Sequence, residues 1–210
     1  MTSSEQKLRQ ILEQLYLQLD HGWQAFLAYR YASTALEEGL ITDLFYIVKS
    51  IELSCLDSVY LALSKLLIDN KDSITIWYLL NYIDSDPKIL TGTQPEQIKA
   101  STDQHRQQLV ALQTTTMKIE ERRDRTIAHL DRKHVNDPST VYVNDSLNEL
   151  EVQNAFKLAL EILNSYAGYL GLQQPFSLDA HSAGLAEDWY KLVTLINPAT
   201  KASEHKARAG

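Results

Sequence analysis

The sequence predicts an all-α protein, an up-down helical bundle of five to seven helices. Leu and Ala lead the composition, whereas only seven Gly and five Pro occur among 210 residues, which favours helices over hairpins. Apolar residues recur at spacings of three and four over long stretches, the period of an amphipathic helix. The only segment with strand character, residues 141–143, is too short and isolated to form a sheet. We expect one helical domain over residues 1–198 and a disordered tail over 199–210.

Each helix is predicted from its apolar spacing and from the residues that begin or end it. Gly39 marks the turn after the first helix, and two capping-box patterns, Thr93–Glu96 and Ser146–Glu149, each begin a later helix. The second helix is apolar nearly all round, so we expect it to be central and buried. The predicted helices cover residues 4–32, 43–68, 74–83, from the first capping box to 134, from the second to 170, and 183–196.

Composition and charge narrow the class of protein. The single cysteine, Cys55, excludes a disulfide framework and a cysteine-rich zinc site. The first ten residues contain no apolar run typical of a signal peptide, and no window is long and apolar enough to span a membrane. We therefore expect a soluble, cytoplasmic protein without a membrane partner. The formal net charge of −7 argues against broad coating of nucleic acid but allows a local basic site.

One stretch departs from this acidic background. Residues 118–134, KIEERRDRTIAHLDRKH, contain six Lys or Arg and two His. On a helix, Arg123 falls in the apolar stripe that contains Ile119 and Ile127, and the acidic residues occupy a face of their own. Most charged helix faces are simply solvated and stabilised by pairs such as Glu121–Arg125. The segregation of the two signs favours a binding face instead. That basic face contains Lys118, Arg122, Arg125, His129, Arg132 and Lys133.

Two residues of this stretch suggest chemistry. A guanidinium in the apolar stripe needs an anion, and Asp124 points about 100° away from Arg123 on a helix. We therefore expect the partner of Arg123 to come from another helix, another subunit or a ligand phosphate. The cations around His129 disfavour its imidazolium form, and a neutral imidazole near pH 7 can act as a general base.

The sequence RDRTIAH, with Arg123, Asp124 and His129, fits the Arg-polar-x-x-x-x-His signature of the HEPN superfamily. These are all-helical domains, many of them ribonucleases of toxin, antiphage and RNA-processing systems. The longer RDRTIAHLDRK and the upstream LDSVYLALSKLLIDNKDSITIWYLLN resemble the abortive-infection, AbiU-like branch more closely. The resemblance spans roughly residues 10–170.

The resemblance implies a homodimer in which the motifs of two protomers meet across a cleft and cleave RNA without a metal. Arg123 would bind the scissile phosphate, His129 would transfer a proton, and Asp124 would orient one of them. Arg123 and His129 lie about 120° apart on one helix, so two helices related by a two-fold axis can bring them together more easily than one chain can. The residues expected to contact the substrate are Lys118, Arg122, Arg125, Asp131, Arg132 and Lys133.

Two functions from different classes stay open. The first is a toxin-like or antiphage endoribonuclease, and the second is a non-catalytic helical dimer that binds RNA, a nucleotide or a protein through the same cleft. The chain contains no Gly-rich phosphate loop, nucleophile elbow or His-Glu-x-x-His motif, so we expect no metal and no cofactor. Some HEPN toxins that pair with a nucleotidyltransferase antitoxin have Tyr where this chain has Asp131. That difference argues against this antitoxin and leaves any other antitoxin unidentified.

Overall fold

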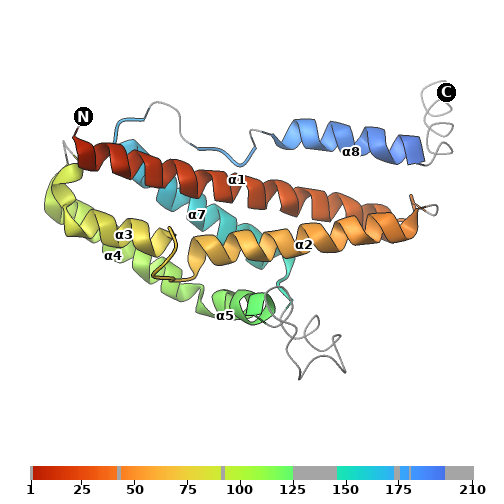
Figure 1. The fold of residues 1–210 in the computed structure, drawn as a ribbon, viewed down its shortest axis with the longest axis horizontal. Coiled ribbons are helices and arrows are strands. Elements are labelled where there is room, and N and C mark those ends of the chain that lie inside the picture. The colour runs from red at the N-terminus through yellow and green to blue at the C-terminus, as the bar shows by residue number, and fades with distance from the viewer. Residues whose placement is uncertain are drawn as a thin grey trace. The chain divides into compact units, whose positions relative to one another are not determined.

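The computed structural model describes residues 2–41, 44–90, 93–124, 146–172, 176–179 and 181–196. Within these ranges the chain forms seven α-helices, one short 3-10 helix and no strand (Figure 1), which confirms the all-α prediction. The expected extended segment 141–143 and the expected tail 199–210 lie outside the described residues. The helices are α1 (Ser3–Glu37), α2 (Phe45–Leu67), α3 (Ile76–Ser85), η1 (Pro87–Ile89), α4 (Pro95–Ala111), α5 (Gln113–Arg122), α7 (Glu149–Tyr169) and α8 (Ser182–Ile196).

The chain divides into two compact units. The first unit contains Met1–His21 and Tyr60–Ser177, and the second contains Gly22–Val59 and Leu178–Gly210. Helices α1 and α2 each contribute one end to each unit. The basic stretch at 118–134 belongs to the first unit. The prediction of a single domain over 1–198 stays a prediction.

The first unit buries apolar side chains from all of its helices. Helices α3 and α4 lie side by side within it (Figure 1). Among its buried polar groups, His105 on α4 has Nδ1 3.0 Å from the hydroxyl of Tyr166 on α7. Burial lowers the pKa of His105, because desolvation disfavours the imidazolium. The fully buried side chains of this unit include Leu8, Leu12, Leu15, Leu19, Leu63, Leu66, Leu79, Leu80, Ile98, Phe156, Ala159 and Leu163.

The second unit has a smaller core, made by α1, α2, α8 and the turn after α1. Gly39 ends α1 with a positive φ of 65°. The amide of Leu40 donates to the carbonyl of Ala35 at 2.9 Å, and that of Gly39 donates to Leu36. This is the helix-ending pattern that favours glycine, and it confirms the predicted turn. The buried cluster is Ala32, Ala35, Ile41, Val48 and Val193, with Leu36, Leu40, Trp189 and Ile196 packed against it.

Two predictions about helix interiors are wrong. The long helix predicted up to residue 134 is interrupted at Leu112, which separates α4 from α5. Three consecutive Thr follow at 114–116, and β-branched residues have low helix propensity. Helix α2 was expected to be buried all round, yet its first turn is exposed: Phe45 is 45 % exposed, Tyr46 84 % and Ile47 55 %.

Both predicted capping boxes are also wrong: the first does not form, and the second lies two residues later than predicted. The residue before α4 is Gln94, whose side chain makes no capping hydrogen bond, and Pro95 occupies the first turn, where its missing N–H costs nothing. At α7 the capping box is Asn148 with Glu151 rather than Ser146 with Glu149. The Asn148 side chain accepts from the Glu151 amide at 2.9 Å, and the Glu151 carboxylate accepts from the Asn148 amide at 2.8 Å. None of the helices in the described ranges combines the length and apolar character that spanning a membrane requires.

Candidate functional site

The described part of the candidate site is the end of α5. This helix buries Thr115, Ile119 and Arg122. At Arg123 and Asp124 the backbone widens into a π-helical turn, a feature that occurs often at functional sites. The amide of Arg123 still donates to the carbonyls of Ile119 and Glu120, so the turn stays attached to the helix. The first two residues of the Arg-polar-x-x-x-x-His motif therefore follow directly from an ordered helix.

The arginine in the core is Arg122 and not Arg123, which corrects the sequence prediction. Arg122 is 2 % exposed, and its guanidinium carbon lies 4.5 Å from the centroid of the Tyr60 ring. A cation over an aromatic face gains electrostatic attraction that partly offsets its desolvation. After Ile119, helical spacing allows the next buried residue at +3 or at +4, and the fold selects +3. Arg122, expected on the substrate-contacting face, is therefore a packed core residue.

Arg123 lies at the surface, and its partner is the neighbour that helical geometry had excluded. Its side chain is 26 % exposed. Its Nε donates to Asp124 Oδ1 at 2.7 Å, and Nη2 lies 3.8 Å from Glu120 Oε1. The hydrogen bond to Asp124 raises the pKa of Arg123, so the guanidinium stays charged. The expected need for an anion from another helix or subunit is therefore wrong for the chain as described.

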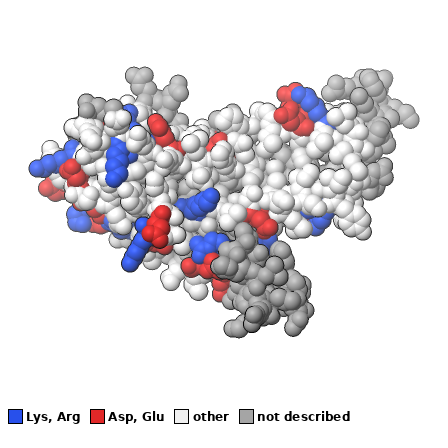
Figure 2. Space-filling model, viewed as in Figure 1, with Lys and Arg blue, Asp and Glu red and all other residues white. Residues whose placement is uncertain are grey.

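Some cations of the basic face already form contacts within the chain. Lys118 Nζ lies 2.7 Å from Glu151 Oε1, and this same Glu151 closes the capping box of α7. The ion pair joins the middle of α5 to the start of α7. Figure 2 likewise shows Lys or Arg next to Asp or Glu at several places on the face it presents. Lys118 and Arg122 thus have structural contacts in addition to any contact with substrate.

Tyr60 contacts both ends of the segment that contains the rest of the motif. Its ring packs against Arg122, the last residue of α5. Its hydroxyl accepts a hydrogen bond from the amide of Leu147, two residues before α7, at 2.7 Å. Tyr60 is itself only 1 % exposed. One buried side chain from α2 therefore contacts both Arg122 and Leu147, the residues on either side of 123–146.

The remaining site residues lie outside the described residues. These are His129 of the predicted catalytic group and four of the predicted substrate contacts, Arg125, Asp131, Arg132 and Lys133. Their roles stay predictions. Sequence reasoning missed Tyr60, Leu147 and Glu151 as parts of the site. Tyr60 looked like any other apolar residue of α2, and no sequence signal links it to residues 62 and 87 positions away.

Comparison with known proteins gives one result. No curated protein and no solved structure matches the chain. Residues 5–192 match the family HEPN_AbiU2, described as AbiU2. This match begins two residues after the start of α1 and ends four residues before the end of α8, and it includes the motif from Arg123 to His129. The chain therefore belongs to the AbiU2 branch of the HEPN superfamily.

Proposed function

We propose that this protein is a metal-independent endoribonuclease of the HEPN type with a toxin-like role in antiphage defence. The observation that supports this most is the exposed Arg123 guanidinium held by Asp124. Membership of the AbiU2 family adds the link to abortive infection. An arginine whose position is set by a carboxylate, at the surface and permanently charged, is suited to binding a phosphate.

In the proposed reaction, Asp124 holds Nε of Arg123 and leaves terminal N–H groups of the guanidinium to bind the scissile phosphate. His129 takes the proton of the 2′-hydroxyl or delivers one to the leaving oxygen. The 2′-oxygen attacks phosphorus, and the bond from phosphorus to the 5′-oxygen breaks. The products are a 2′,3′-cyclic phosphate and a 5′-hydroxyl, so the reaction requires no metal and no cofactor.

The active unit in this proposal is a homodimer. Arg123 and His129 are six positions apart, so they project about 120° apart on a regular helix. Two motifs related by a two-fold axis can place the arginine of one protomer beside the histidine of the other. Because Lys118 and Arg122 already have contacts within the chain, most RNA contacts fall to Arg123, Arg125, Arg132 and Lys133. An antitoxin partner is left unidentified.

Purified protein tests the chemistry directly. We expect cleavage of single-stranded RNA in EDTA with a 2′,3′-cyclic phosphate end, and no cleavage where the scissile nucleotide is 2′-deoxy. His129→Ala should reduce the rate by about 10²–10⁴-fold, the usual contribution of a positioned acid or base. Arg123→Ala should reduce the cleavage rate by a comparable factor. Arg123→Lys should not cleave at the wild-type rate either, because lysine lacks the planar guanidinium. His134→Ala is the matched control and should cleave at the wild-type rate.

Mixing the two inactive Ala variants tests whether the site is shared between subunits. If each site combines Arg123 of one chain with His129 of the other, mixed dimers regain one intact site and part of the activity. Absence of cleavage by the wild-type protein, or full activity of His129→Ala, would contradict the enzyme proposal.

The alternative is a non-catalytic dimer that binds RNA, a nucleotide or a protein through the same cleft. One observation, in the second unit and therefore outside the unit that contains the Arg123 motif, favours a protein partner. The beginning of α2 exposes Leu44, Phe45, Tyr46 and Ile47 together, and such clusters often mark protein contacts. RNA binding without cleavage, unaffected by His129→Ala, would select this alternative.

A further inference from the structure

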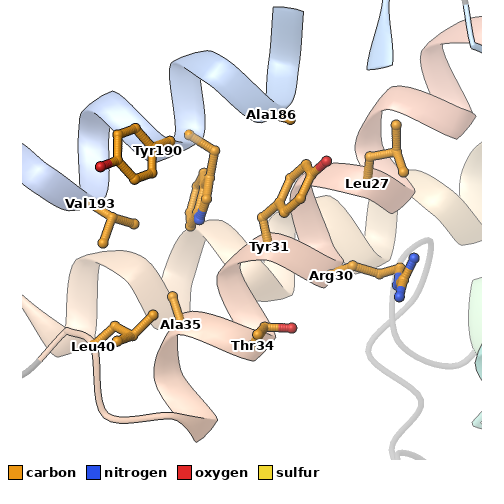
Figure 3. Close-up of a pocket in the computed structure, with 10 residues that line it drawn as sticks. Leu27, Arg30, Tyr31, Thr34, Ala35, Leu40, Ala186, Tyr190 and Val193 are labelled. Carbon is orange, nitrogen blue, oxygen red and sulfur yellow. The ribbon is translucent and has the colours of Figure 1, made fainter. Parts of the chain in front are cut away.

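The second unit contains a cavity that the proposed function does not use. Its volume is about 550 Å³, within the usual range of small-molecule sites. Figure 3 shows Tyr190 and Val193 on α8 facing Tyr31 and Ala35 on α1 across this space. The described residues that line it all belong to the second unit: Leu27, Arg30, Tyr31, Thr34, Ala35, Leu40, Ala186, Trp189, Tyr190 and Val193.

The two facing helices line the cavity with both small side chains and large aromatic rings. The lining residues of α1 and of α8 recur at spacings of three and four, so each set forms one helix face. Within these faces Ala35 and Ala186 contribute only a methyl group, whereas Tyr31, Trp189 and Tyr190 contribute large rings. The two alanines leave space beside these rings.

The walls are suited to a flat aromatic group. The rings of Tyr31 and Trp189 lie nearly parallel, with their centroids 6.4 Å apart and an angle of 20° between their planes. Both side chains are half-buried, so part of each ring surface still faces the open space. Aromatic surfaces favour offset stacking on further rings, and the other walls are mainly aliphatic.

The charge of the lining is positive. Arg30 is the single charged residue among the ten that line the cavity, and it lies at the exposed rim with its guanidinium carbon 5.9 Å from the Phe26 ring centroid. The nearby acids of α8 lie outside the lining. Glu187 and Asp188 form ion pairs with Lys191, at 2.8 Å and 3.6 Å. An anionic ligand would therefore meet a cation at the rim, and the described residues of the walls include no carboxylate.

We propose that this cavity binds one small organic anion with a flat aromatic body, stacked on the rings of Tyr31 and Trp189 and oriented by Arg30. The site is separate from the Arg123 motif, which belongs to the first unit. The proposal therefore stands or fails independently of ribonuclease activity.

Two fluorescent probes with the same rings, one charged and one neutral, test whether the cavity prefers an anionic ligand. Anilinonaphthalene sulfonate has one negative charge, and phenylnaphthylamine has none. We expect both to bind the full-length wild-type protein, the sulfonate at a ratio of one per chain. Arg30→Gln should lower the affinity for the sulfonate by about two- to fivefold, the size expected from the loss of an exposed ion pair. The affinity for the neutral probe should not change. Lys191→Gln is the matched control, because it removes one cation outside the lining and should change neither affinity.

A second pair of variants tests the location. Ala186→Phe fills the cavity and should lower the affinity for both probes by about tenfold or more. Ala183→Phe makes the same change at an exposed position of α8 outside the lining and should leave both affinities as in the wild type. Circular dichroism checks that the variants stay folded. If Ala186→Phe fails to fold, the Arg30 and Lys191 pair still decides the outcome.

Three results would overturn the proposal. The first is a sulfonate affinity that falls equally in Arg30→Gln and Lys191→Gln, which would indicate general attraction to cations. The second is unchanged binding of both probes to a folded Ala186→Phe, which would place the probes elsewhere. The third is absence of saturable sulfonate binding to the wild-type protein.

Discussion

Arg122 and Arg123 follow each other in the chain but lie in opposite environments. Arg122 is 2 % exposed and packs on the Tyr60 ring, whereas the side chain of Arg123 is 26 % exposed and donates to Asp124. The first contributes to folding because its aliphatic stem and its charge both rest against the core. The second contributes little to folding and is available for an anion. Adjacent identical side chains thus allow the structural and functional roles to be separated by experiment.

We predict that Arg122→Ala lowers the free energy of unfolding by about 2 kcal/mol, from the loss of a desolvated cation–π contact and its packing. Arg123→Ala, the matched control, should change it by less than about 0.5 kcal/mol, as at most surface sites. Urea titration followed by circular dichroism measures both. In a Tyr60→Leu background the Arg122→Ala cost should shrink, since the ring is already gone. Equal costs for the two arginines would contradict the assignment of Arg122 to the core.

The beginning of α7 shows how one element supports the site. Asn148 and Glu151 close the capping box, and Glu151 also binds Lys118 of α5 at 2.7 Å. The hydrogen bonds to Lys118 and to the Asn148 amide lower the pKa of Glu151 against the opposing effect of burial. A single carboxylate therefore fixes both the first turn of α7 and its attachment to the helix that precedes the motif.

We predict that Asn148→Ala lowers the free energy of unfolding by about 1 kcal/mol, the usual cost of losing an N-cap. Asn148→Ser retains an oxygen that can accept from the Glu151 amide, so its cost should be smaller. Thermal and urea unfolding measure the difference. If the Ser and Ala variants are equally stable, the side chain of Asn148 contributes no cap in solution.

At the scale of the whole molecule, one argument for the expected homodimer no longer holds, and the structure offers a different one. Arg123 no longer requires an anion from a second subunit, because Asp124 and Glu120 lie beside it. The exposed first turn of α2 instead presents apolar side chains that a second copy could cover. A two-fold arrangement would bring the same surface of both copies together.

We predict a dimer in sedimentation equilibrium at micromolar concentration. The double change Tyr46→Lys and Ile47→Lys should shift it towards monomer, because two charges cannot be buried in a dimer contact without partners. Val110→Lys is the control, since it changes an equally apolar residue, 59 % exposed, on α4. A monomer of the chain mass in the wild type would contradict the shared site. A dimer that tolerates the α2 change would place the contact elsewhere.

The sequence by itself determined the helical class, the approximate bounds of several helices and the family. Apolar spacing located α8 to within one residue of its observed start and placed α2 and α3 within two. The motif RDRTIAH and the upstream segment LDSVYLALSKLLIDNKDSITIWYLLN together resembled the HEPN superfamily, and the family match confirms it. These successes rest on local properties, because helical period and short motifs are written in neighbouring residues.

Only the tertiary structure decided which residues of those helices are buried and which partners they have. Spacing allowed either Arg122 or Arg123 to follow Ile119 into the core, and the Tyr60 ring, 62 positions earlier, selects Arg122. The capping box of α7 is formed by Asn148 and Glu151, and Glu151 also forms an ion pair with Lys118 of α5. The cavity of the second unit requires α1 and α8 to face each other across two alanines. Such choices depend on contacts between residues far apart in the chain, and periodicity along one helix contains no information about them.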